Sequence, residues 1–313
     1  MSKYILDFEG PLLKLEEKIE SLHSMSMKTG VDVTSSIQQL EVELLAKKTS
    51  IYNNLSRWER VQLARHPKRP YSSDYIERIT DEWIELHGDR YFSDDTAIIG
   101  GIGKISGESF VIIGQEKGRG TKNKLYRNFG MPRPEGYRKA LRLMKLAEKF
   151  NIPVLTIIDT IGAYPGLGAE ERGQAEAIAR NLFEMARLNV PIISFVIGEG
   201  ASGGALGVGV ADRLLCFENT WYSVISPEGC ASILFRDATR APEAADSMKV
   251  TAQDLFDLGI ADKIISEPDG GAHLNYDESA IIMKDVVLEE YAALKTKSNE
   301  QLIDDRMEKY EKM

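Results

Sequence analysis

The chain has 313 residues, of which 43% are hydrophobic and 28% are charged, which is the composition of a globular protein with a sizeable core. Its net charge of −9 argues against general nucleic-acid binding, which needs a basic surface. No apolar run reaches the ~18 residues of a membrane-spanning helix, and residues 1–9 lack a signal-peptide pattern. The two cysteines have no histidine at metal-ligand spacing, so we expect reduced thiols, no metal site in this chain and a cytoplasmic location.

The first 70 residues predict a helical extension. Apolar residues recur at helical spacing over 11–62, with a break at 28–34 that holds Gly30. The polar faces are rich in Glu and Lys, so we expect two amphipathic helices paired as a hairpin. Such a hairpin is typical of a packing or interface arm, and Pro67 and Pro70 mark the linker that follows it.

Residues 71–268 carry the pattern of a parallel α/β core. The predicted elements are a helix at 75–87, strands at 97–105 and 109–115, a polar loop at 117–134, a helix at 136–150, a strand at 154–159, a helix at 169–188, a strand at 192–198, a helix at 203–210 and a strand at 213–217. Strands that alternate with helices predict parallel βα units. The chain beyond residue 227 is mostly helical in pattern, and 269–313 forms a predicted C-terminal helical segment.

The sharpest feature is a glycine-rich turn at 198–209, between a buried strand and a helix. A helix start leaves backbone N–H groups unpaired, its dipole adds positive potential, and glycine lets a ligand approach the backbone. The turn therefore predicts an oxyanion or phosphate site. Close packing of the helix on the strand is the simpler alternative.

A second glycine-rich turn, at 159–168, also follows a buried strand. Ligands gather at the carboxyl ends of parallel strands, so two such turns at one sheet edge favour a functional site. Neither turn has the Gly-Lys-Ser/Thr ending of a phosphate-binding loop, and neither is a Gly-x-Gly-x-x-Gly opening a first βαβ unit. A third turn, 226–229, predicts only a helix start, with Ser226 as the cap and Pro227 as the first helical residue.

The stretch 115–145 is locally basic, with ten Lys or Arg residues against two Glu. Part of it fits a solvated helix face. The loop at 117–127, however, lies beside the predicted site and would steer a partner or substrate that bears phosphates or carboxylates, such as coenzyme A or an acidic carrier domain.

A rival interpretation is hydrolysis. Residues 200–204 fit the Gly-x-Ser-x-Gly nucleophile elbow with Ser202 as nucleophile, and either Asp212 or Asp262 with His273 would complete a triad. The additional glycines weaken this interpretation, because they loosen a turn that normally holds the serine under strain. A scaffold subunit without chemistry is a third possibility, supported only by the helical arms.

The chain resembles the α subunit of bacterial acetyl-CoA carboxylase carboxyltransferase. The matching strings are His87-Gly88-Asp89-Arg90, residues 127–131, residues 134–144, Asp159-Thr160 with 162–166, residues 170–174, residues 198–206, residues 222–231, and Glu267-Pro268 with 270–273. Ala201 stands where this family commonly has Gly, and Ile161 where it has Pro or Lys. Because Ala201 has a Cβ, it would resist a positive φ at that position, but we expect the change to be tolerated.

The resemblance implies an α/β fold of the crotonase-like (ClpP/crotonase) type, a spiral of ββα units with N-terminal and C-terminal helical extensions. It divides the chain into a helical hairpin at 1–70, a carboxyltransferase core at 71–268 and a helical segment at 269–313. It also implies an α2β2 heterotetramer in which only the β subunit carries zinc. The implied partners are that β subunit, the biotin carboxyl carrier protein and biotin carboxylase. The implied reaction moves a carboxyl group from carboxybiotin on the carrier protein to the thioester acetyl-CoA, giving malonyl-CoA for fatty-acid biosynthesis.

The resemblance also implies roles for individual residues. An oxyanion hole for the biotin oxygen is expected from backbone N–H groups among Gly203, Gly204 and Ala205, and Ser202 is expected to be a turn residue or a weak donor, not a nucleophile. Gly162, Ala163, Tyr164 and Gly166 are expected to form the opposing wall of the pocket. The charge pattern, independently of the resemblance, makes Lys117, Arg119 and Lys122 candidate groups for binding phosphates or carboxylates.

Overall fold

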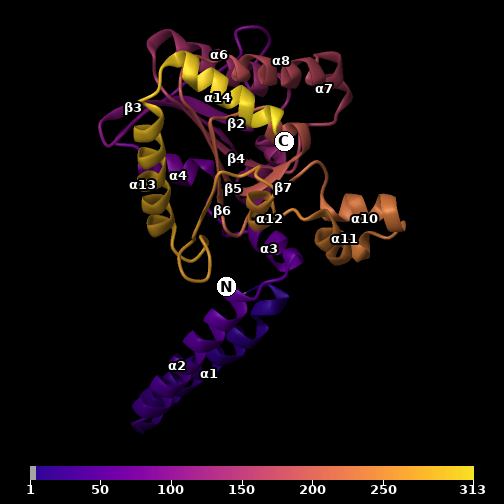
Figure 1. Cartoon of the computed structure of the whole chain (residues 1–313). Coiled ribbons are helices and arrows are strands. Elements are labelled where there is room, and N and C mark those ends of the chain that lie inside the picture. The colour runs from indigo at the N-terminus through magenta and orange to yellow at the C-terminus, as the bar shows by residue number, and fades with distance from the viewer. Residues whose placement is uncertain (1–4) are drawn as a thin grey trace.

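The structure is a computed structural model that describes residues 5–313 (Figure 1). Its α-helices are α1 (Gly10–Thr29), α2 (Thr34–Asn53), α3 (Arg57–Ala64), α4 (Ser72–Ile79), α5 (Gly120–Tyr126), α6 (Pro134–Phe150), α7 (Leu167–Glu171), α8 (Gln174–Ala186), α9 (Ser202–Leu206), α10 (Pro227–Phe235), α11 (Ala241–Met248), α12 (Ala252–Asp257), α13 (Tyr276–Leu294) and α14 (Asn299–Glu311). Its strands are β1 (Glu82–Glu85), β2 (Ile98–Ile105), β3 (Glu108–Gln115), β4 (Val154–Thr160), β5 (Ile192–Ala201), β6 (Arg213–Phe217), β7 (Trp221–Ser223) and β8 (Lys263–Ile265).

The strands form one mixed sheet in the order β1-β2-β3-β4-β5-β6-β8, and the short β7 pairs with the end of β5. β1, β2 and β3 are antiparallel neighbours, whereas each pairing from β3 onward is parallel. Parallel neighbours end at the same edge of a sheet. The two glycine-rich turns follow β4 and β5, so the topology brings them side by side.

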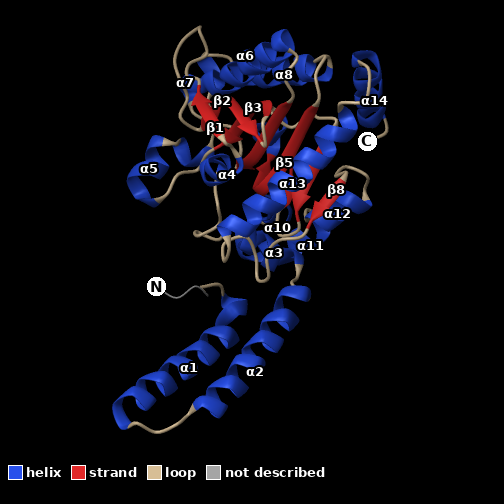
Figure 2. Ribbon diagram, turned by 90° about the vertical axis from the view of Figure 1, so that its left-hand side faces the viewer, coloured by secondary structure: helices blue, strands red, loops and turns tan. Residues whose placement is uncertain are grey.

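Helices cover both faces of the sheet (Figure 2). One core cluster joins the sheet to α6 and α8, and the other joins it to α4 and α13. Successive residues of the central strands alternate between the two clusters: Val154 faces the first and Leu155 the second, and Ile192 and Ile193 repeat this one strand over. The apolar runs of β4 and β5 are therefore buried on both faces, as their sequence predicts.

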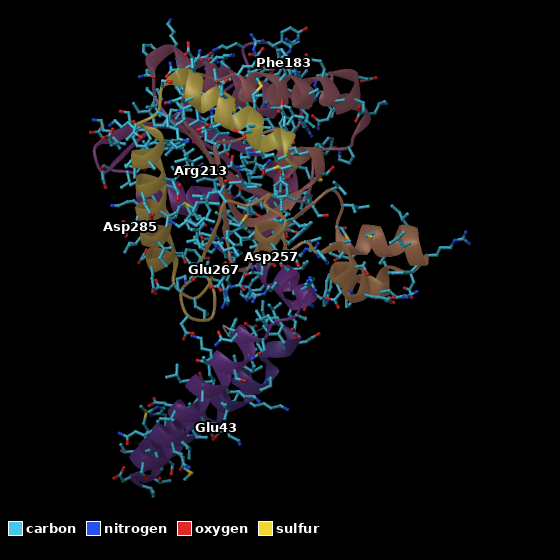
Figure 3. The ribbon with its side chains drawn as sticks, in the orientation of Figure 1. Glu43, Phe183, Arg213, Asp257, Glu267 and Asp285 are labelled. Carbon is cyan, nitrogen blue, oxygen red and sulfur yellow. The ribbon has the colours of Figure 1, made fainter. Side chains whose placement is uncertain are left out.

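The helical hairpin expected within residues 11–62 is present as α1 and α2. It extends away from the sheet, with Glu43 out along α2 (Figure 3). Gly30 ends α1 in the left-handed conformation, with φ +70°, which glycine adopts without a Cβ penalty. At the core end, the Lys48 ammonium contacts Asp269, with 2.8 Å between Nζ and Oδ2. None of the helices within residues 5–313 combines the length and apolarity needed to span a membrane.

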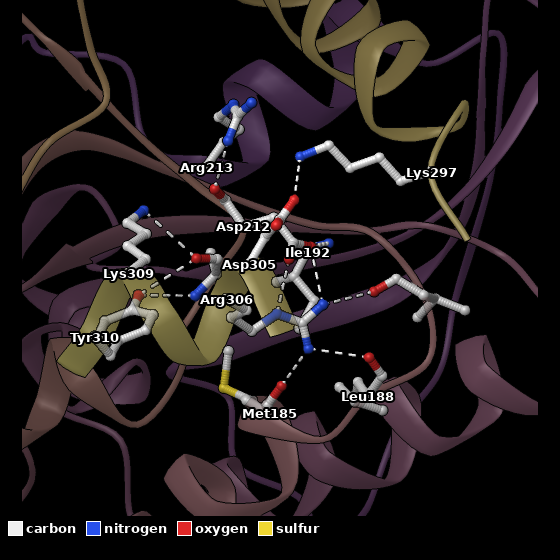
Figure 4. Close-up of polar contacts among 12 residues, drawn as sticks. Met185, Leu188, Ile192, Asp212, Arg213, Lys297, Asp305, Arg306, Lys309 and Tyr310 are labelled. Carbon is white, nitrogen blue, oxygen red and sulfur yellow. Dashed lines mark hydrogen bonds and ion pairs between the residues drawn. The ribbon is translucent and has the colours of Figure 1, made fainter. Parts of the chain in front are cut away.

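The C-terminal helix α14 is fastened to the core by one buried guanidinium (Figure 4). Arg306 is 1% exposed and donates to both carboxylate oxygens of Asp212, at 2.9 Å each. It also donates to the backbone carbonyls of Met185, Leu188 and Val190. Two of these carbonyls lie at or just beyond the C-terminal end of α8, where helix carbonyls lack partners within the helix. Arg306 therefore ties α14 to both α8 and the sheet.

Four sequence predictions need correction. The helix expected at 75–87 ends at Ile79, and the edge strand β1 follows it, because residues 82–85 pair with β2. The helix expected at 169–188 breaks at Gly173, whose φ is +82°. The polar loop after β3 contains the short helix α5. The helix expected at 203–210 is only the five-residue α9.

Candidate active site

The two glycine-rich turns touch each other through their backbones. A Cβ placed on Gly204 would lie 2.5 Å from the Ala163 nitrogen and 2.7 Å from Gly162 Cα. Both neighbours are backbone atoms, which cannot rotate away as a side chain can. Glycine at 204 is thus required by this contact, and the structure brings the two predicted halves of the site together.

The turn after β5 has a different conformation from the one that its sequence suggests. Ala201 is extended, with φ −108°, so its Cβ meets no conformational resistance. The left-handed residue is instead Ser202, with φ +58°. Alanine is therefore accommodated at position 201, as expected, and the conformational cost of the turn falls on Ser202, at about 1 kcal/mol.

The head of α9 leaves backbone donors unpaired. Among residues 5–313, the N–H groups of Gly203 and Gly204 have no hydrogen-bond acceptor. Gly203 is half-buried, whereas Gly204 and Ala205 are buried. Unpaired N–H groups at the start of a helix favour an anionic atom nearby.

The turn after β4 is held rigid from several sides. Thr160 Oγ1 accepts from the Gly162 N–H at 3.0 Å and donates to the carbonyl of Gly130 at 2.6 Å. Gly162 has φ +137°, and a Cβ on Gly166 would overlap the ring of Tyr164. The Gln174 side-chain amide donates to the Tyr164 carbonyl at 2.9 Å. This turn forms a fixed wall opposite α9.

A buried ionic cluster lies at the same edge of the sheet. The Lys117 ammonium is 2.6 Å from a carboxylate oxygen of Asp159 and 2.6 Å from one of Glu199. Burial alone would lower the pKa of Lys117, but the two carboxylates outweigh it and the pKa lies above its usual value. Burial raises the pKa of Asp159 despite Lys117. For Glu199, burial would raise the pKa, but Lys117 and Arg65 outweigh it and hold the pKa below its usual value.

Lys117 therefore differs from the free cation that its sequence context suggests, because its charge is already matched by carboxylates. It lines a pocket of roughly 210 Å³. The other lining residues are Ala64, Arg65, His66, Pro67, Tyr71, Lys124, Phe129, Ile161 and Glu199. Ile161 and Glu199 belong to the segments that carry the two glycine-rich turns, so the pocket adjoins them.

Arg65, which the sequence interpretation missed, connects the pocket to the projecting helix α10. Its guanidinium contacts Glu199 at 2.6 Å and Glu228 at 2.5 Å. Glu228 lies in the first turn of α10, after the Pro227 helix start that the sequence predicts. Arg65 and Glu199 are 134 positions apart, so residue spacing gives no sign of this pair. The one available signal is a charged residue between two glycines, Gly198 and Gly200.

Arg119 and Lys122, the other two cations expected at the site, differ in their contacts. Arg119 pairs with Asp74 through two contacts of 2.7 and 3.0 Å, and its guanidinium lies 4.6 Å from the centre of the Tyr71 ring. Lys122 is exposed on α5, on a surface that it shares with Arg119 and Tyr126. Lys122 is thus the more available of the two cations for an anionic ligand.

The groups proposed for a serine hydrolase do not gather at Ser202. Asp212 is occupied by Arg306, and Asp262 accepts from Lys309 at 2.5 Å. His273 is buried against His66, with 4.0 Å between the ring centres, under the N-terminal hairpin. Ser202 therefore lacks the base and carboxylate of a triad, and the hydrolase interpretation is not supported.

Comparisons with known proteins agree with this geometry. Residues 5–313 match the family model described as acetyl co-enzyme A carboxylase carboxyltransferase-like. The chain is 55% identical over 309 residues to the acetyl-coenzyme A carboxylase carboxyl transferase subunit alpha of Flavobacterium johnsoniae, covering 98% of both chains. It is 54% identical over 306 residues to the protein of the same name from Halorhodospira halophila, covering 98% of this chain and 96% of that one.

Solved structures are similar in fold. The transcarboxylase 12S structure has a TM-score of 0.59 at 20% identity over 73% of this chain, and this chain spans 43% of the transcarboxylase chain. The β subunit of Pseudomonas aeruginosa geranyl-CoA carboxylase has a TM-score of 0.56 at 19% identity, over 77% of this chain and 45% of that one. The expected crotonase-like α/β fold is confirmed. On its full-length similarity and its fold, the chain belongs to the acetyl-CoA carboxylase carboxyltransferase family, among the α subunits.

Proposed function

We propose that this chain is the α subunit of an acetyl-CoA carboxylase carboxyltransferase, which moves a carboxyl group from carboxybiotin on a carrier protein to acetyl-CoA and yields malonyl-CoA. The observation that carries this proposal is the pair of unpaired N–H groups at Gly203 and Gly204, at the sheet edge where the two turns meet. The family supplies the reaction, and the geometry supplies a place for an oxyanion.

The neutral donors suit the chemistry of the biotin side. When bound, carboxybiotin would supply the carboxyl group, and negative charge on its ureido oxygen would need hydrogen-bond donors. The backbone N–H groups of Gly203, Gly204 and Ala205 would stabilise that charge, and each donor would lower the activation barrier by about 3 kcal/mol. Because they are fixed by the fold, they need no reorganisation when the charge develops.

Other residues of this chain would shape the pocket and attract the substrates to it. The rigid turn of Gly162, Ala163, Tyr164 and Gly166 forms the wall that faces α9. Lys117 lines the adjoining pocket with its charge matched. Arg119 and Lys122 would attract the phosphates of coenzyme A or the acidic surface of a carrier domain by long-range electrostatics.

We propose an α2β2 assembly, with a β subunit that carries zinc and receives the thioester, and with biotin carboxylase and the biotin carboxyl carrier protein completing the enzyme. We retain 71–268 as the carboxyltransferase core. The flanking segments 1–70 and 269–313 would serve packing and assembly, because α1 and α2 extend from the core as an arm.

The test is reconstitution. The chain is co-expressed with a candidate β subunit, and the purified complex is assayed for decarboxylation of malonyl-CoA in the presence of a biotin derivative. We expect activity from the complex and none from the chain alone. Activity of the chain alone on thioesters, or its failure to form a complex, would contradict the proposal.

Within the same assay, the Ser202→Ala variant distinguishes carboxyl transfer from hydrolysis by a serine nucleophile. Because Ser202 is assigned only to the turn, we expect the variant complex to keep most of its transfer rate. A serine nucleophile would instead lose nearly all activity on this change.

A further inference from the structure

The five-residue helix α9 needs outside support. A helix this short gains too few internal hydrogen bonds to be stable by itself. In a longer helix the carbonyl of Gly204 would accept from the N–H of Val208. Here that N–H bonds to the carbonyl of Ala205, at 3.2 Å, which leaves the Gly204 carbonyl without a partner in the helix.

Two buried side chains from other elements donate to the Gly204 carbonyl instead. The side-chain amide of Gln115, at the end of β3, donates to the Gly204 carbonyl oxygen at 2.7 Å. The hydroxyl of Tyr137, on α6, donates to the same oxygen at 3.2 Å. Both side chains are 0% exposed, so neither bond competes with solvent.

Gln115 is itself fixed at its other end. Its side-chain oxygen accepts from the Asp159 N–H at 3.2 Å, at the end of β4. The Gln115 amide therefore links the end of β4, where the glycine-rich turn at 159–168 begins, to α9 in the glycine-rich turn after β5. Its two bonds define its orientation, since the carbonyl needs a donor and the N–H needs an acceptor.

We propose that Gln115 and Tyr137 are positioning residues, which set the orientation of the Gly204–Ala205 peptide and thereby aim the Ala205 N–H, one of the three proposed oxyanion donors of α9. The peptide group is planar and trans, so its C=O and N–H point in opposite directions. Holding the Gly204 carbonyl on the core side turns the Ala205 N–H away from it, toward the head of α9. This inference rests on the proposed oxyanion hole.

The test uses the reconstituted complex with single and double variants. Gln115→Met keeps the length of the side chain and removes both bonds, and Tyr137→Phe removes one hydroxyl. Since a misplacement of about 1 Å can cost about 100-fold in rate, we expect kcat to fall about 10- to 100-fold in the first and about 3- to 10-fold in the second. The KM for malonyl-CoA and for the biotin derivative should stay within about twofold, because the donors act on charge that forms only during transfer.

Thr156→Val is the matched control. Thr156 is fully buried in β4 and makes one side-chain hydrogen bond, to Ser194 at 2.6 Å, within the sheet. We expect its loss to lower thermal stability without lowering kcat. Because Gln115 and Tyr137 act on one oxygen, their combined effect on log kcat should depart from the sum of the single effects, whereas Tyr137→Phe combined with Thr156→Val should be additive.

The outcomes are distinguishable. Unchanged kcat in a folded Gln115→Met complex, a loss no larger than that of Thr156→Val, or a loss confined to KM would overturn the positioning role. If Gln115→Met does not assemble, Tyr137→Phe decides, and a kcat within about 1.5-fold of the parent overturns the role. Full activity after Gly204→Ala would instead remove the oxyanion hole itself, and the proposed function of α9 with it.

Discussion

Replacing Gly204 by alanine is the most direct perturbation of the proposed site. The new methyl group would meet the carbonyl carbon of Gly162, and it would lie 2.5 Å from the nitrogen of Ala163. Real Cβ atoms do not approach this closely, so α9 or the turn after β4 must move. Either movement separates the donors of α9 from the wall that faces them.

The size of the effect follows from this contact. Overpacking a well-packed region costs typically about 1–3 kcal/mol, which for a chain of this length lowers the melting temperature by a few degrees. The catalytic loss should be larger. Displacing the donors by about 1 Å, or losing one of them, costs about 100-fold in kcat. The complex should therefore stay assembled at 25 °C while its transfer rate collapses.

The assay compares kcat for malonyl-CoA decarboxylation with melting temperature for three variants. Gly203→Ala is a control for melting temperature alone, because its methyl group would sit 3.6 Å from Ile178, an ordinary contact, while Gly203 itself is a proposed donor. Gly103→Ala is the control for strain elsewhere. Gly103 lies in β2, two strands away from β4, and its new methyl group would lie 2.9 Å from the Cγ2 of Thr80. We expect Gly103→Ala to lose stability and keep kcat. A Gly204→Ala complex with parental kcat, or one whose loss merely matches that of Gly103→Ala, would refute the reasoning.

Three further variants test other parts of the structure. Arg306→Met leaves the buried Asp212 carboxylate unpaired, so we expect about 3–5 kcal/mol less stability and a melting temperature lower by about 10 °C, measured by calorimetry. Lys122→Glu should raise KM for the biotin carrier or the CoA thioester at low salt, with no change in melting temperature, and equal KM values would make that residue ordinary surface. Burial lowers the pKa of His66 to about 4 and that of His273 to about 2. The unfolded chain therefore takes up protons below pH 6.5 that the folded chain excludes, and stability should fall by up to about 3 kcal/mol from His66 alone as the pH drops from 6.5 to 4. Unfolding by urea at several pH values, with His66→Asn as the comparison, measures this slope.

Local sequence predicted much of the sheet because its strands are buried on both faces. The runs Val154–Ile158 and Ile192–Ile197 are almost entirely apolar, so burial on both faces of a sheet is the environment that suits them. The strand at 213–217 has the predicted bounds. The predictions failed where tertiary contacts override local preference. Residues 82–85 join the sheet because β2 offers an edge, and where α9 stops early the Gly204 carbonyl accepts from side chains of β3 and α6 instead.

The sequence alone determined that glycines follow two neighbouring strands, and by resemblance it determined the family. Only the tertiary structure decided which charges are free. In the sequence, Lys117 is a basic loop residue that follows a predicted strand. The fold places its ammonium between Asp159 and Glu199, from two other strands, and their carboxylates compensate its positive charge. The same holds for Arg65 with Glu199 and for Gln115 with Gly204, pairs separated by 134 and 89 positions. Local spacing specifies helices, strands and turns, whereas contacts between distant segments are fixed only when the sheet forms and the helices pack onto it.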